Sequence, residues 1–267
     1  MRTRAVVAGS SLFVSALAVL TGAAHALDIG DPGAPDPGHG SASVSASAGT
    51  LLPLTLSPRV NAERVAVAVT SGYDGGNASA TFVTTADVRL AGPVGARVGF
   101  TYLPDVTGKV FQPHVGLRLQ LLHQGQHGLD GAVAVFYRME RLTQDEGMVQ
   151  LLWTMARRFN TLSLFANLAY GQDPEGDDRD GELRIAAQIA ASSRLQLGVD
   201  GRIRVDLFST DARRGMRGAT NLDFAVGPLA TLTVGRFAFV GHAGMSGVRA
   251  SVLRTGVLAT MGVASVF

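Results

Sequence analysis

The chain has 267 residues, a formal net charge of +2 and 46% hydrophobic residues, so it is long and apolar enough to bury a core. This near-neutral balance gives no indication of nucleic-acid binding, which depends on clustered positive charge. Cysteine is absent, so disulfides do not hold the fold together. The 33 glycines are typical of a chain with many strands and tight turns.

The N-terminal sequence predicts a cleaved secretory signal peptide over residues 1–26. Two arginines precede a largely apolar run from Ala5 to Leu20, and Ala24 and Ala26 are the small residues that a signal peptidase reads. An uncleaved membrane anchor, the alternative, would need a longer apolar run. Cleavage would remove the two arginines and leave an exported chain that is formally neutral, because the whole chain carries +2.

Residues 27–60 are expected to form a disordered periplasmic leader or linker. The stretch 28–50 consists mainly of Gly, Pro, Ser, Ala and Asp, and it has almost nothing to bury. Such a composition does not support a packed element.

From about residue 61 the sequence alternates between apolar and polar side chains, which is the period of a β-strand. In the segment 194–207, Leu197 and Val199 alternate with Asp200 and Arg202. The pattern predicts one domain over residues 61–267. Its twelve predicted strands are 63–73, 78–90, 94–104, 110–122, 129–138, 148–157, 161–171, 182–191, 194–207, 219–233, 236–245 and 251–267.

Alternation alone fits either a soluble sandwich with an apolar interior or a membrane barrel with an apolar exterior. The connection lengths favour the barrel, because odd-numbered connections are mostly longer than even-numbered ones, as external loops and periplasmic turns would be. The tyrosines also favour it, since all four lie on the apolar side near the outer ends of odd-numbered strands and predict an aromatic girdle at one membrane interface. They are Tyr73, Tyr102, Tyr137 and Tyr170.

The last residues of the chain end on Phe267, with apolar side chains such as Val263 and Met261 at alternate positions before it. This pattern resembles the C-terminal signature of bacterial outer-membrane β-barrel proteins, from which Ser265 departs. The resemblance implies that the outer-membrane assembly machinery recognises the last strand, which then closes the barrel against the first. We therefore predict an all-β, transmembrane, antiparallel up-and-down barrel of twelve strands, in contact with outer-membrane lipid in the envelope of a Gram-negative bacterium.

The polar side of the predicted strands would line the lumen of this barrel. The candidates for lining the lumen and setting its selectivity are Arg97, Arg118, Arg184, Arg202, Arg204, His114 and His242. In a structural interpretation the arginines pair with acids on neighbouring strands, whereas in a functional one they form a basic constriction that favours anions. The third and fourth strands bring no acid, while Asp200 and Asp206 accompany the arginines of the ninth, so Arg97 and Arg118 should dominate any anion preference.

No catalytic residue, cofactor or metal site is expected. His114 and His242 are interpreted as hydrogen-bonded fillers of the lumen. The His-x-Ser spacing that the outer-membrane phospholipase family presents on its barrel wall occurs here only at residues 39–41, within the predicted linker. The acidic loop 172–181 departs from EF-hand spacing, so a solvated loop is favoured over a calcium site.

The predicted function is a narrow channel for small polar or anionic solutes. Two alternatives remain at this stage. One is a plugged barrel with a structural or surface-interaction role, and the other is an enzyme embedded in the outer membrane.

Overall fold

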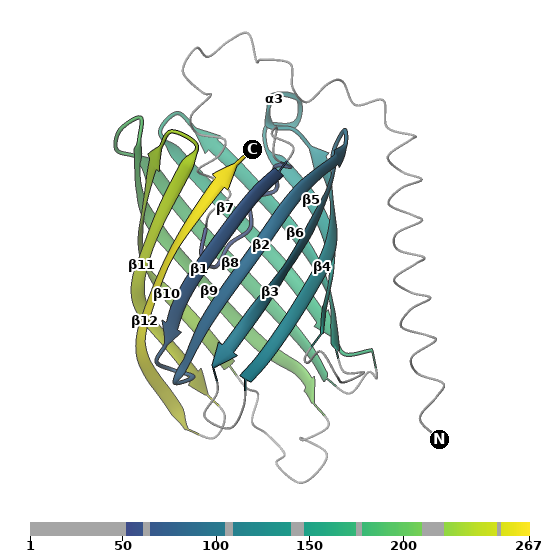
Figure 1. Cartoon of the computed structure of the whole chain (residues 1–267), viewed down its shortest axis with the longest axis vertical. Helices are drawn as coiled ribbons and strands as arrows, with labels where there is room; N and C mark the ends of the chain where they lie inside the picture. Colours follow the sequence, from purple (N-terminus) through teal and green to yellow (C-terminus); the bar gives the residue numbers. More distant parts are fainter. Residues whose placement is uncertain are drawn as a thin grey trace.

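The computed structural model describes residues 52–60, 65–104, 109–139, 147–174, 178–209, 222–249 and 252–267. In these residues twelve antiparallel strands form a closed barrel, in which each strand pairs with its neighbours in sequence and the last pairs with the first (Figure 1). The strands are β1 Val65–Asp74, β2 Ser79–Ala91, β3 Val94–Pro104, β4 Lys109–Leu122, β5 Asp130–Met139, β6 Gly147–Phe159, β7 Leu162–Gln172, β8 Asp178–Ala190, β9 Leu195–Ser209, β10 Leu222–Val234, β11 Phe237–Arg249 and β12 Leu253–Val266. The twelve-stranded up-and-down barrel predicted from the sequence is confirmed.

The two ends of the barrel differ in their connections. One end, uppermost in Figure 1, carries the short turns, the helical turn α3 (Gln124–His127) and Phe267. The opposite end carries the longer connections, most of which lie outside the described residues. We refer to these as the short-turn end and the long-loop end.

The pairing register sends alternate side chains to the two faces of the wall. On β6, Trp153 is 55% exposed on the outer face, whereas the neighbouring Leu152 and Thr154 are each 1% exposed on the inner face. Large apolar side chains such as Leu168 and Met261 are among the most exposed on the outside. Such a surface is costly in water and favourable in lipid, as a membrane barrel requires.

The seam between β1 and β12 closes the barrel. Ala68 pairs with Ala264 along the seam, and Val65 and Phe267 exchange two backbone hydrogen bonds, of 2.8 and 3.3 Å. The guanidinium of Arg236, in the turn before β11, lies 5.2 Å from the centre of the Phe267 ring, within cation–π range. Recognition of Phe267, Val263 and Met261 by the assembly machinery stays a prediction.

Within the part of the chain that the structure describes, no helix is both long enough and apolar enough to cross a membrane.

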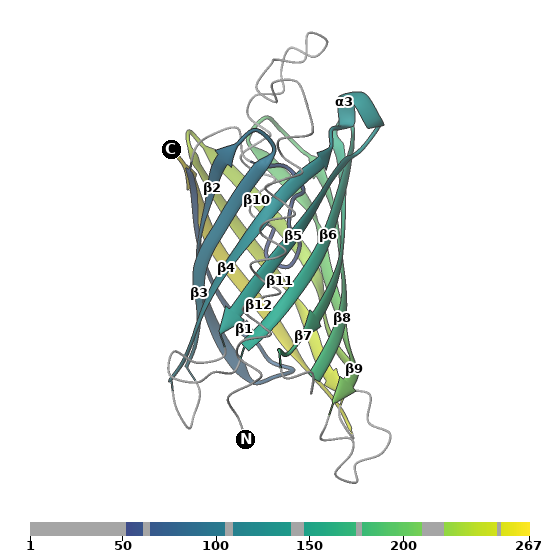
Figure 2. The same ribbon diagram turned by 90° about the vertical axis from the view of Figure 1, so that its right-hand side faces the viewer.

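Residues 52–60 lie inside the barrel, where Figure 2 shows them as a dark purple trace surrounded by the wall. The expected disordered leader extended to residue 60, so the prediction is wrong for this last part. The physical reason is that three leucines in this stretch offer apolar side chains to bury, while its backbone finds hydrogen-bond partners on the wall. The predicted signal peptide and the leader up to residue 51 lie outside the described residues. We refer to residues 52–60 as the plug.

Candidate functional site

Two apolar pockets of the lumen hold leucines of the plug. Leu56 packs with Ala134, Phe136, Leu152 and Ala169 from β5, β6 and β7. Further along the plug, Leu52 packs with a second set of wall residues, namely Phe165, Ala186 and Leu229 from β7, β8 and β10. The plug therefore spans the lumen from the β5–β7 wall toward the β8–β10 wall.

The wall also binds the backbone of the plug. Asn167 on β7 accepts a hydrogen bond from the Leu56 N–H at 2.6 Å and donates one to the Leu56 carbonyl at 2.8 Å. Asp200 on β9 accepts a bond from the Leu54 N–H at 2.9 Å. Both wall side chains are almost fully buried, with residue exposures of 1% and 0%. Buried polar groups of this kind are stable only when they are paired, and here the plug supplies the partners.

The remainder of the plug is bound at another part of the wall, on β4. The Arg118 guanidinium donates to the backbone carbonyls of Ser57 and Arg59, the second at 3.1 Å. The side-chain oxygen of Gln120 accepts a bond from the Val60 N–H at 3.1 Å. Arg118, a candidate for anion selectivity, therefore serves to hold the plug.

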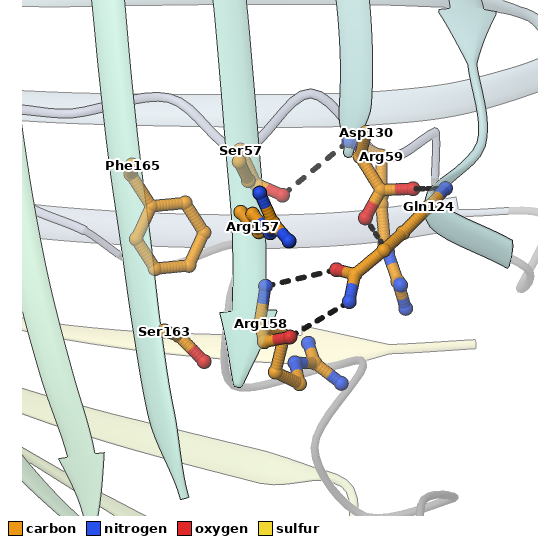
Figure 3. Close-up of a pocket in the computed structure, with 9 residues that line it drawn as sticks. Ser57, Arg59, Gln124, Asp130, Arg157, Arg158, Ser163 and Phe165 are labelled. Atoms are coloured by element: carbon orange, nitrogen blue, oxygen red, sulfur yellow. Dashed lines mark hydrogen bonds and ion pairs between the residues drawn. The ribbon is translucent and has the colours of Figure 1, made fainter. Parts of the chain in front are cut away.

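The plug is further tied to the short-turn end by side-chain contacts, which Figure 3 shows. Arg59 Nε lies 2.7 Å from an oxygen of Asp130, whose other oxygen accepts the backbone N–H of Gln124 at 3.0 Å. The Gln124 side chain in turn bonds the N–H and the carbonyl of Arg158 at 2.8 and 2.7 Å. Farther from the short-turn end, the Thr55 hydroxyl donates to Asp200 at 2.6 Å. The plug is thus held by its side chains as well as by its backbone.

The first charged group of the wall lies on β2–β4 toward the short-turn end, next to the plug. Arg97 makes a forked pair with Asp87, at 2.9 and 2.7 Å, and Arg118 contacts the same carboxylate at 3.3 Å. The expectation that these arginines lack an acid is correct for their own strands, but β2 supplies one. Two guanidinium groups share one carboxylate, so this wall keeps a positive excess.

The second charged group lies on β8–β10. Arg184 makes two hydrogen bonds to Glu182, at 2.8 and 3.0 Å. Arg202 forms an ion pair with Asp223 at 2.8 Å, and Arg204 forms one with Asp180 at 2.5 Å. Asp200 was expected to neutralise arginines here, but it binds the plug instead. The actual partners are Asp180, Glu182 and Asp223. Asp180 falls in the predicted loop 172–181, because the alternation indicates a strand only from residue 182, whereas β8 begins at Asp178.

The two charged groups lie on opposite sides of the barrel, since β3 and β9 are diametrically placed in the strand order. The lumen arginines toward the long-loop end remain partly solvent-accessible, at 25% for Arg202 and 35% for Arg204, whereas Arg97 retains 17% and Arg118, beside the plug, 4%. We call the part of the lumen around the plug the closed half. The part lined by Thr101, Arg202 and Arg204 is the open half.

The two lumen histidines differ in their surroundings. His114 on β4 is partly exposed and packs over Gly99, where a Cβ would come within 2.7 Å of its ring nitrogen. His242 on β11 is buried, and among the described residues neither of its ring nitrogens has a hydrogen-bond partner. The interpretation of His242 as a hydrogen-bonded filler stays a prediction.

The tyrosines lie on the outer face near the long-loop end. Tyr73 and Tyr170 are 50% and 39% exposed, and the Tyr170 hydroxyl donates to Gln172 at 3.1 Å. Tyr102 and Tyr137 share this face by register, because they pair with the outward-facing Phe111 and Val149. Their function as a membrane-interface girdle stays a prediction.

Comparisons with known proteins support the fold. No family model matches the sequence, and no curated protein matches it. Among solved structures, the chain is similar to the NanC porin, with a TM-score of 0.54 and 10% identity over 75% of this chain and 100% of that chain. It is also similar to LpxR from Salmonella typhimurium, with a TM-score of 0.50 and 8% identity over 76% of this chain and 100% of that chain. At these identities the likeness shows the outer-membrane β-barrel fold alone.

Proposed function

We propose that the protein is an outer-membrane channel for small polar or anionic solutes, and that its own plug closes it in the conformation described above. The observation that carries this proposal is the division of the lumen. The open half has charged, partly solvated walls, such as those at Arg202 and Arg204. Among the described residues, the closed half is filled by the plug, which packs against wall side chains such as Phe136 and Phe165.

The exterior of the barrel supports an outer-membrane location. Its exposed apolar side chains suit a lipid environment, and the short-turn end would face the periplasm, as in other bacterial outer-membrane barrels. The long-loop end, with the open half of the lumen, would then face the outside.

The contacts of the plug favour the closed state strongly. Burial of one leucine side chain contributes about 1.5–3 kcal/mol, and a hydrogen bond to a charged group contributes about 1.5–3 kcal/mol. The plug buries two leucines, Leu52 and Leu56, and makes hydrogen bonds to the charged groups of Asp200, Arg118 and Asp130. A solute can pass only if these contacts are broken together.

Planar-bilayer conductance of the full chain tests this proposal. The parent should show rare or no openings, whereas the variant L52S/L56S, which removes both apolar anchors and leaves the wall unchanged, should open frequently. The matched control is L54S, because the Leu54 side chain is only partly buried and this residue is held through its backbone N–H. Conductance of L54S should stay near that of the parent.

A second candidate function is a permanently plugged barrel with a structural or surface-interaction role. The anchoring of the plug to β4, β7 and β9 at once favours it. If L52S/L56S inserts normally, exposes its lumen and still carries no current, the structural barrel is the better account.

A further inference from the structure

The polar contacts between the wall and the plug are directed mainly at the backbone of the plug. Four wall side chains bind it through main-chain groups: Asp200, Asn167, Arg118 and Gln120. Together they contact the N–H groups of Leu54, Leu56 and Val60, and the carbonyls of Leu56, Ser57 and Arg59. Every peptide carries such groups, so these contacts do not depend on the plug's sequence.

Asn167 shows this most clearly. Its side-chain oxygen accepts the N–H of Leu56, and its amide nitrogen donates to the carbonyl of the same plug residue and also to the carbonyl of Ala166. Such a two-bond contact fits any residue of an extended chain. The side chain of Leu56 is selected separately, by the apolar pocket that includes Leu152.

The side-chain contacts add a modest selectivity. The two apolar pockets accept residues four positions apart, Leu52 and Leu56. Asp130 accepts a basic side chain at the short-turn end, where it holds Arg59. Pro58 lacks an N–H, and the wall leaves that position uncontacted while it binds the carbonyls on either side.

Buried polar groups continue the site beyond Leu52. Leu229 on β10 belongs to the same apolar cluster as Leu52. In the sheet, Leu229 pairs with His242 on β11 and with Gly198 on β9. Gly198 pairs in turn with Gln188 on β8. Within the described residues, the Gln188 amide nitrogen and both His242 ring nitrogens lack hydrogen-bond partners, although these residues are only 2% and 3% exposed. Unpaired buried groups are costly, and the polar backbone of a longer bound chain would satisfy them.

We propose that the lumen is a binding site for extended oligopeptides, and that the plug occupies it as an internal stand-in for such a ligand. This inference rests on the proposed function, because the peptides would reach the site through the proposed channel. It names peptides as the class of solute that the channel admits. A ligand would compete with the plug for Asn167, Asp200 and Arg118. A bound ligand therefore replaces the plug at these wall groups, so that ligand binding releases the plug.

The test uses the full chain and a labelled synthetic peptide, LPLTLSPRV, which is residues 52–60. Fluorescence anisotropy should show the peptide binding to L52S/L56S at least about tenfold more tightly than to the parent, whose own plug fills the site. The same peptide methylated on the Leu56 nitrogen should lose at least about tenfold in affinity, because it cannot donate to Asn167. A peptide of the same composition with the residues other than proline reordered should still bind, within about tenfold of the original.

Each arm can overturn the inference. Equal binding by the methylated and unmethylated peptides would show that the backbone is not what the wall recognises. Failure of the reordered peptide to bind would show that the site accepts only the plug's own sequence. The N167L substitution in the L52S/L56S chain checks the wall side, and the methylated peptide keeps the test decisive should that variant not fold.

The outcomes also separate this inference from the channel proposal. Peptide binding without any conductance in L52S/L56S would refute the channel and leave the peptide site in place. Conductance without peptide binding would refute the peptide site and leave the channel in place.

Discussion

The closed and open halves of the lumen are built by the same strands with the same alternation, yet they satisfy their polar groups differently. In the closed half, wall groups such as Asn167 and Asp200 pair with the backbone of the plug and lie under 2% exposed. In the open half, arginines such as Arg202 and Arg204 pair with carboxylates of neighbouring strands and keep contact with solvent. The comparison shows that a polar lumen face does not by itself make a pore. Whether the lumen is open depends on which groups fill it.

The largest expected difference between the halves is in stability. The variant L152A removes a side chain that is 1% exposed and packs against Leu56, so it should lower the free energy of unfolding by about 2–5 kcal/mol. The variant V83A, at a partly exposed lumen position of the open half, should cost about 1.5 kcal/mol or less. Denaturant unfolding of both variants in lipid gives the comparison, and equal losses would mean that the closed half is not a packed core.

The next largest effect should be on gating. The variant D200A removes the acceptor of two plug hydrogen bonds, from the Leu54 N–H and the Thr55 hydroxyl. Loss of bonds to a charged group should raise the open probability by about tenfold or more in bilayer recordings. The control D206N lies on the same strand toward the long-loop end and does not touch the plug. Should D206N open the channel as much as D200A does, the plug contact would not be the cause.

The smallest effect should be on ion selectivity, measured as the reversal potential in a salt gradient with L52S/L56S as background. Arg97 and Arg118 share one carboxylate, whereas each arginine of the β8–β10 group has its own. The variant R97Q should therefore lower the anion-to-cation permeability ratio by about twofold, and R204Q by less. An unchanged reversal potential for R97Q would remove the basis for an anion preference.

The strand architecture was predictable because alternation is a local signal that each strand repeats. The predicted 94–104 matches β3, and the other boundaries differ by a few residues. The alternation along each strand also predicts which arginines face the lumen. It does not predict which carboxylates pair with them. Pairing of Arg97 with Asp87 depends on the register between β2 and β3, which the sequence of either strand alone does not contain.

The plug was not predictable in the same way. It is held chiefly by its backbone, which leaves no periodic pattern in the sequence. One signal was present, because residues 51–60 contain four leucines and a valine, while the preceding 28–50 contain almost nothing apolar. That change in composition marks the start of a segment that can be buried, although it does not say where.

The central claim, that residues 52–60 separate a closed half of the lumen from an open one, is tested most directly by cysteine labelling. The chain has no cysteine, so each single cysteine substitution can be labelled without labelling of other residues. With a membrane-impermeant maleimide added in solution, T101C in the open half should label rapidly, while T154C, at a lumen residue 1% exposed in the closed half, should label slowly in the parent and rapidly in L52S/L56S. Equally fast labelling of T154C and T101C in the parent chain would contradict the account.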